Sequence, residues 1–141
     1  MILLCAANLH GSGQSSPVSQ ETRAQARVAF THGLSRLNGG HPKVSVVEVT
    51  YPPGGSSPPH SHPCPVIGYV IEGTLKTQVK GEAEAIYRAG ESSYEAPNGV
   101  HQVSANASEK DRARLLAYFV CDRETALSVA PHEPPAAAER Q

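Results

Sequence analysis

The chain has 141 residues, the usual length of one domain built around a single hydrophobic core. Its 12 Lys and Arg residues are scattered and nearly balance 13 Asp and Glu residues, so there is no basic patch of the kind that binds nucleic acid. The cysteines Cys5, Cys64 and Cys121 are odd in number and widely spaced, which argues against a disulfide framework and fits a protein that needs no oxidising compartment.

The N-terminal segment, residues 1–25, is expected to be flexible. Residues 1–7 are apolar but lack the charged start of a secretory signal, and they are too few for a transmembrane helix. They fit either a frayed terminus or the remnant of a longer export signal, since a linker-like Gly/Ser stretch follows. The cytoplasm is therefore the expected location, and export to the periplasm is the alternative.

Short strands separated by turns are the pattern of residues 26–122. Residues 43–50 are rich in β-branched side chains and stop at a Pro/Gly turn. Short strands at this spacing predict an all-β sandwich or barrel. Further strand-like segments follow at 66–71, 75–79, 85–88, 100–104 and 115–121.

Both ends of this pattern are less regular. Residues 27–31 are expected to add a strand, although 20–30 also fits a short helix because Glu, Gln, Arg and Ala dominate it. Residues 123–141, rich in Pro and Ala, are expected to form a tail, loosely attached from Pro131 onward.

Three histidines carry the chemistry. His60 and His62 lie two positions apart, so in extended structure they point to the same side, and His101 follows a Pro/Gly turn at the start of a later strand. Neutral imidazoles bind zinc, iron, manganese, nickel and copper, and three of them leave positions open for water, substrate or dioxygen. These residues predict one divalent metal ion of unspecified identity.

At these residues the chain resembles the cupin superfamily, whose members are jelly-roll barrels holding one metal ion among inward-facing histidines. The first cupin motif, G(X)5HXH(X)3,4E(X)6G, is met by Gly54, His60, His62 and Gly73. The second motif is met, with one-residue departures in spacing, by Gly90, Pro97, Gly99, His101 and Asn106. The resemblance implies a single-domain double-stranded β-helix over about residues 26–121 and a homodimer that pairs through edge strands and a long terminal segment.

One motif residue is missing. Val66 stands where the motif has its metal-binding glutamate, so the usual set of three histidines and one glutamate is reduced to His60, His62 and His101. Cys64 has the parity to act as a soft fourth ligand, although Pro63 and Pro65 disturb the alternation, and a small buried thiol is the other interpretation.

The remaining candidates have plain interpretations. Gln78, Glu95 and Gln102 are within reach of the pocket but are expected to face solvent. The tyrosines in or beside strands are expected to fill the core, and the motif glycines to form turns. The tyrosines concerned are Tyr69, Tyr87, Tyr94 and Tyr118; the histidines outside the motifs, His10, His32, His41 and His132, are expected at the surface.

The expected function is a metal-dependent enzyme acting on a small organic molecule. Apolar residues in 66–71 and 115–120 suit a weakly polar substrate, and the three-histidine set resembles the iron sites of some dioxygenase branches of the superfamily. A non-catalytic barrel that binds or senses a ligand is the alternative that the absent glutamate favours. A metal-assisted lyase or isomerase is the third, and it requires an acid/base partner that the sequence does not reveal.

Overall fold

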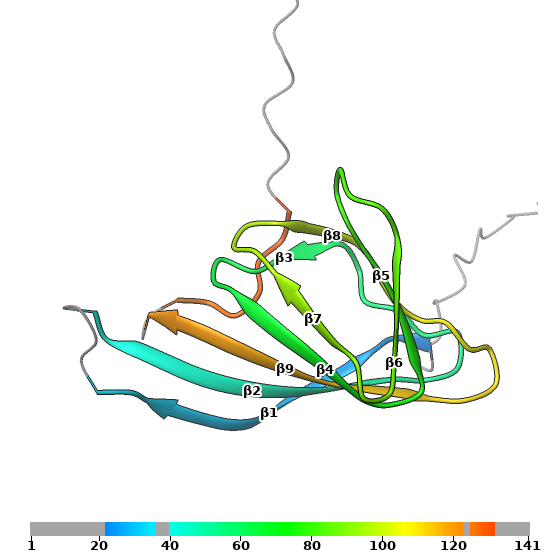
Figure 1. The fold of residues 1–141 in the computed structure, drawn as a ribbon, viewed down its shortest axis with the longest axis horizontal. Helices are drawn as coiled ribbons and strands as arrows, with labels where there is room; N and C mark the ends of the chain where they lie inside the picture. The colour runs from blue at the N-terminus through cyan, green and yellow to red at the C-terminus, as the bar shows by residue number, and fades with distance from the viewer. Residues whose placement is uncertain (1–21, 36–39, 123–124, 132–141) are drawn as a thin grey trace, which may run out of the picture.

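The computed structural model describes residues 22–35, 40–122 and 125–131, and its strands form two facing antiparallel sheets (Figure 1). The larger sheet has the order β1-β2-β9-β4-β7 and the smaller has β3-β8-β5-β6. The strands are Gln25–Gly33 (β1), Pro42–Tyr51 (β2), His60–Ser61 (β3), Val66–Glu72 (β4), Thr74–Val79 (β5), Ala85–Arg88 (β6), Ser92–Glu95 (β7), Val100–Asn106 (β8) and Ala113–Asp122 (β9). The all-β prediction is confirmed, and among these residues no helix is long and apolar enough to span a membrane.

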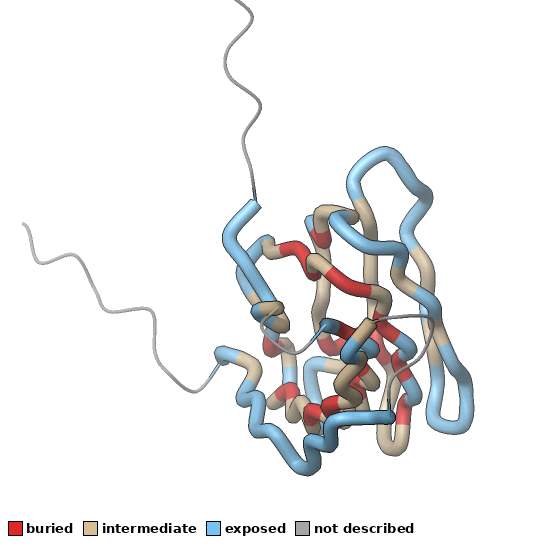
Figure 2. The backbone as a smooth tube through the Cα atoms, turned by 90° about the vertical axis from the view of Figure 1, so that its left-hand side faces the viewer, coloured by how far each residue is buried: buried red, intermediate tan, exposed pale blue. Residues whose placement is uncertain are grey.

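The core lies between the two sheets, where the buried segments gather in Figure 2. Strand β4 shows why: Val66 and Val70 are almost fully buried, whereas Ile67 and Tyr69 between them are exposed. This alternation follows from the two-residue period of a strand with one face on the core. One core cluster surrounds Val66 and Phe119, and a second surrounds Tyr51 and Val70.

Shifts in strand register determine which side chains face inward at several positions. In the β5–β8 pair, Val79 lies opposite His101 but Gln78 lies opposite Val103, so Gln102 is an extra residue. His101 and Ser104 therefore both line the interior cavity despite their odd spacing. A similar shift in β1 turns Val28 toward Val47 and the cavity, while Phe30 pairs with Val46 on the outer face.

The expectation that the four motif glycines form turns is met in part. Gly54, Gly73 and Gly90 have the positive φ that favours glycine, whereas at the fourth motif position Asn98, the residue before Gly99, takes that conformation. Gly73 is also tightly enclosed, since a Cβ there would lie 2.6 Å from the Arg112 carbonyl oxygen.

Two local expectations are corrected by the strand positions. Residues 20–30 do not form a helix in their described part; β1 covers the predicted strand at 27–31. The expectation that Tyr69 and Tyr94 fill the core is wrong, because both point outward from the larger sheet and are 40% and 67% exposed. Strand β7 is short and polar, which is why no hydrophobic pattern predicts it or the direction of its side chains.

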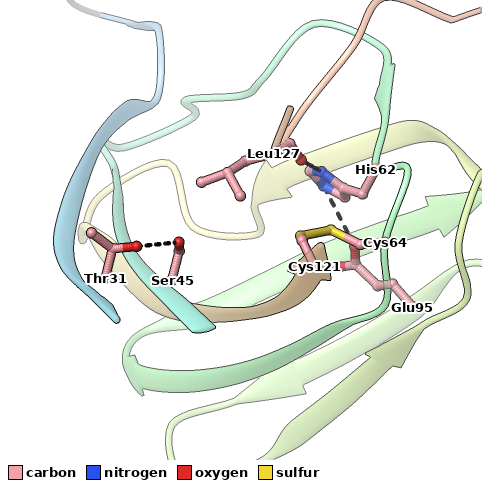
Figure 3. Close-up of a disulfide and its surroundings, with 7 residues drawn as sticks. All are labelled: Thr31, Ser45, His62, Cys64, Glu95, Cys121 and Leu127. Carbon is pink, nitrogen blue, oxygen red and sulfur yellow. Dashed lines mark hydrogen bonds and ion pairs between the residues drawn. A yellow bond between two sulfur atoms is a disulfide. The ribbon is translucent and has the colours of Figure 1, made fainter. Parts of the chain in front are cut away.

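The cysteine expectation is also wrong. Cys64 and Cys121 are both buried and form a disulfide bond, with their Cα atoms 5.3 Å apart (Figure 3). Strand β4 pairs with β9 so that Val66 lies opposite Phe119, which brings the residues just before one strand and at the end of the other together. Cys64 is therefore committed to this bond and does not serve as a free thiolate ligand.

Candidate metal centre

His60 lies in β3, at an edge of the smaller sheet, and His62 directly follows that strand. The ring of His60 lies 4.8 Å from that of His62, measured between centroids. The Nδ1–H of His60 donates to the Pro58 carbonyl oxygen at 2.8 Å. The Nδ1–H of His62 donates to the Leu127 carbonyl oxygen at 2.6 Å (Figure 3). Each ring therefore keeps its Nε2 free to bind a metal, the arrangement that outer hydrogen bonds usually impose on metal-binding histidines.

His101 completes the predicted trio. It lies directly opposite His60 in the β3–β8 pair, with ring centroids 5.3 Å apart, and 5.7 Å separate it from the ring of His62. The side chain is almost fully buried. The structure thus brings together all three histidines that the motifs single out.

Glu95 is the fourth polar residue of the centre, and the expectation that it faces solvent is wrong. Its Oε2 lies 2.9 Å from Nε2 of His101 and 3.6 Å from Nε2 of His62. Glu95 stands directly opposite Val66 in the β4–β7 pair, so both side chains point to the same face. A carboxylate from the neighbouring strand therefore lies beside the motif position that Val66 occupies. Its position beside Val66 depends on the strand pairing, which the motif spacing does not reveal.

The carboxylate of Glu95 and one ring nitrogen of His101 suit a cation, since a neutral imidazole carries its proton on the other nitrogen. Oε2 of Glu95 and both ring nitrogens of His101 are buried and have no hydrogen-bond partner among the described residues. Unsatisfied buried groups of this kind cost free energy unless a ligand binds them. Within the described ranges no three His, Cys, Asp or Glu side chains are grouped closely enough to hold a metal ion. The donor set, three imidazoles and one carboxylate, fits a divalent transition metal.

The environment of His62 keeps it in the metal-binding form. Burial lowers the pKa of His62 below its usual value, and the neighbouring His60 and His101 act in the same direction against the Leu127 carbonyl and Glu95. Phe119 packs edge-on against the ring, with centroids 5.1 Å apart. The ring is thus held neutral and in a fixed orientation.

A C-terminal strap, residues 125–131, contributes to this orientation. Val129 exchanges two backbone hydrogen bonds with Ser61, at 2.9 and 3.0 Å, and Leu127 packs against the core cluster around Val66. The sequence places these residues in the tail, whereas the structure packs them against β3. The strap therefore forms part of the wall around His62.

A cavity of about 410 Å³ adjoins the four residues. Most of its wall is apolar, supplied by β1, β2, β4, β9 and the strap, and its volume is within the range typical of small-molecule sites. The hydroxyl of Tyr51 lies on this wall, 2.8 Å from the Ser104 hydroxyl, and the Ser57 hydroxyl donates to it at 3.4 Å. Sequence reasoning missed Tyr51 because the residue closes β2 beside a Pro/Gly turn.

The remaining candidates lie away from the cavity. Gln102 is exposed, as expected, and Gln78 donates to the Glu82 carbonyl oxygen instead of lining the wall. His32 and His41 are exposed, whereas His10 and His132 lie outside the described residues.

The comparison with protein families decides the classification. Residues 47–119 match the family model described as cupin domain. The chain belongs to the cupin family. This match confirms the resemblance to cupins that the two histidine motifs indicate. The matched range contains His60, His62, His101 and Glu95. A search of curated proteins gives no significant match.

Solved cupin-like structures share the fold at low sequence identity. An uncharacterised protein with a double-stranded β-helix domain from Klebsiella pneumoniae is 16% identical, covers 82% of this chain and 90% of its own, and has a TM-score of 0.60. KdgF from Halomonas is 19% identical, with 72% and 81% coverage and a TM-score of 0.55. The DMSP lyase DddQ from Ruegeria pomeroyi is 20% identical, with a TM-score of 0.55 over 64% of this cupin and 45% of the lyase chain. This cupin thus spans less than half of the lyase.

Proposed function

We propose that this cupin is a metal-dependent enzyme acting on a small, weakly polar organic molecule, and that His60, His62, His101 and Glu95 bind one divalent metal ion. The observation that carries the proposal is the approach of Glu95 Oε2 to His101 Nε2 at 2.9 Å, with neither atom hydrogen-bonded to another described residue. Four protein ligands leave positions open on an octahedral metal. Iron, manganese, nickel, zinc and copper all accept this donor set.

A bound divalent ion would supply Lewis-acid polarisation of a substrate oxygen, or redox chemistry if the ion is iron, manganese or copper. The residues of the chain supply orientation and exclusion of water. The apolar wall of the cavity holds the substrate body, and Phe119 and the strap keep His62 in place.

An oxygenase is the first reaction class, because an apolar cavity beside an open metal position suits dioxygen and a weakly polar substrate. A metal-assisted lyase is the second, and a specific observation favours it: the Tyr51 hydroxyl in the cavity wall is the kind of acid/base partner that the reaction requires. The structural similarity to a DMSP lyase agrees with this second class. A non-catalytic binding barrel is the third class, and in this proposal Glu95 takes the place of the motif glutamate whose absence favours that class.

Metal analysis tests the centre. Purified protein is expected to bind about one divalent ion per chain, and His101→Ala to lower the metal affinity by more than about 100-fold, because even outer partners of metal ligands typically account for 10–100-fold. Elemental analysis and chelator competition measure both. His41→Ala, a change at an exposed histidine, is the control. Equal metal content in the parent and His101→Ala, or none in the parent, would contradict the proposal.

Oxygen consumption separates the reaction classes. With a panel of enols, diketones and thiols, substrate-dependent oxygen uptake supports the oxygenase. Turnover that continues without dioxygen supports the lyase instead, and binding without turnover supports the non-catalytic barrel.

The proposal includes a homodimer, the state that the family resemblance implies.

We also propose that the protein is exported. The Cys64–Cys121 disulfide favours the exported alternative over the cytoplasm, because such bonds persist mainly in oxidising compartments.

A further inference from the structure

The hydroxyl groups of Tyr51, Ser57 and Ser104 form a small polar cluster in a part of the cavity wall that is otherwise apolar. Tyr51 is 2% exposed, and its hydroxyl lies 2.8 Å from that of Ser104 and 3.4 Å from that of Ser57. The backbone also fixes them, because the Ser57 N–H donates to the Ser104 carbonyl oxygen at 2.9 Å. All three residues line the cavity that the candidate metal ligands share.

One of the three hydroxyl groups keeps an O–H that can donate a hydrogen bond to a ligand. Three hydroxyl groups carry three protons, and among the described residues their side chains share two hydrogen bonds. One O–H therefore remains for an acceptor in the cavity. Asn106 holds this end of the cavity in place, because its side-chain amide donates to the carbonyl oxygens of Pro52 and Asp111 at 3.0 and 2.7 Å.

Charge restricts the ligand. Arg27 is the one basic residue in the wall, and its guanidinium pairs with Glu48 while its side chain is 68% exposed. No other Lys or Arg lines the cavity among the described residues, so a phosphate or a multiply charged acid finds no counter-charge apart from a metal.

We propose that the one unshared O–H of the Tyr51, Ser57 and Ser104 hydroxyl cluster donates to a carbonyl or ether oxygen of an uncharged substrate whose apolar body fills the cavity. The role of this hydroxyl subsite as a substrate site rests on the proposed function, since it orients the molecule relative to the histidines. Its binding chemistry, in contrast, needs no metal.

Titration of metal-free protein with cyclohexanone tests the subsite, with methylenecyclohexane, which lacks the oxygen, as the matched probe. Backbone amide NMR shifts measure both affinities. The protein is expected to bind cyclohexanone more tightly than methylenecyclohexane. Tyr51→Phe is expected to lower the affinity for cyclohexanone by about 3–10-fold, the usual effect of one hydrogen bond, and to leave the affinity for methylenecyclohexane unchanged. Tyr87→Phe, a partly buried tyrosine outside the cavity wall, is the control. Ser104→Ala should act like Tyr51→Phe.

Equal affinity for the two probes in the parent, or cyclohexanone binding that Tyr51→Phe and Ser104→Ala leave unchanged, would overturn the subsite. Because the protein is metal-free in this titration, its outcome is independent of the metal analysis. The subsite and the metal centre can therefore fail separately.

A second, independent observation concerns the outer face of the larger sheet. One side chain from each strand of this sheet, in register across all five, forms an apolar outer row; the sheet itself is the one made of β1, β2, β9, β4 and β7 in Figure 1. The row consists of Phe30, Val46, Tyr118, Ile67 and Tyr94. Phe30, Ile67 and Tyr94 are 55%, 48% and 67% exposed.

The area of this face approaches what a dimer needs. Together with Tyr69 and Val120, the exposed members present on the order of 500 Å². That lies near the upper end of the ~300–600 Å² found for the largest patch of a monomer. Adding the partly buried members brings it toward the roughly 800 Å² that each partner contributes to a standard interface. Glu48 and Arg114, joined by a hydrogen bond at 3.0 Å, form a charged rim on one side.

The geometry points to a second copy of this chain as the occupant. A twofold axis along the outer row places each side chain of the row on its own counterpart in the second copy, so apolar side chains meet apolar ones. The homodimer then forms through the sheet face, and not through the edge strands that the family resemblance implies, and it leaves the cavity on the opposite face of the same sheet accessible.

Sedimentation velocity tests this interface. The parent is expected to be a dimer, and Ile67→Glu to raise the dimer dissociation constant by at least about 100-fold, because two buried like charges face each other. Ile86→Glu is the matched control, since Ile86 is 41% exposed but lies on the smaller sheet. Tyr94→Lys, on an edge strand, provides a second variant if Ile67→Glu fails to fold. A monomeric parent, or dimers in both variants, would overturn the interface.

Discussion

Glu95→Ala is expected to lower the affinity for Zn²⁺ at least about 100-fold, because removing a direct ligand should exceed the loss seen for outer partners. The reason is geometric: Glu95 supplies the one carboxylate oxygen among the described residues that approaches the histidine nitrogens, at 2.9 Å from His101. Competition with a chromophoric chelator measures the change. Glu84→Ala, at an exposed carboxylate, is the control.

Moving the carboxylate back to the motif position sharpens this test. Val66 and Glu95 are directly opposite one another and face the same side, so Val66→Glu in the Glu95→Ala background returns a carboxylate to the cavity about one strand spacing away. Recovery of Zn²⁺ affinity is expected, at some cost in stability because Val66 is fully buried. Unchanged affinity in Glu95→Ala alone would contradict the role of Glu95 as a ligand.

Removing the disulfide is expected to cost about 4 kcal/mol of unfolding free energy, the chain-entropy value for cysteines 57 residues apart. Cys64→Ser with Cys121→Ser provides the variant, and urea denaturation measures the loss. Metal affinity should fall as well, since Cys64 follows His62 by two residues and Cys121 follows Phe119, which packs on the His62 ring.

Counting thiols provides the direct check on this bond. In denatured, unreduced protein a thiol reagent should react with one cysteine per chain, and after reduction with all three. Cys5→Ser is the matched control, because it removes the cysteine that is not in the bond and should leave the unfolding free energy unchanged. Three reactive thiols before reduction would contradict the disulfide.

The sequence by itself determined the fold class and three of the four residues of the candidate centre. Local patterns suffice for these: β-branched runs between Pro/Gly turns predict strands, and the spacing of His60 and His62 places both rings on one side of a strand. The turn before His101 and the glycines at fixed distances complete the two motifs. Each of these signals is a spacing within one short stretch of the chain, Gly54 to Gly73 or Gly90 to Asn106 at the longest.

The tertiary structure alone decided Glu95, the disulfide, Tyr51 and the strap. Each depends on which strands are neighbours: Glu95 meets the histidines because β7 pairs with β4, and Cys64 meets Cys121 because β4 pairs with β9. Bulges further shift the inward positions by one residue, as at Gln102, which strict alternation cannot anticipate. Contacts between residues as far apart as His62 and Leu127 depend on the order of the strands in the sheets and on their register. The spacing of residues along the chain predicts neither of these.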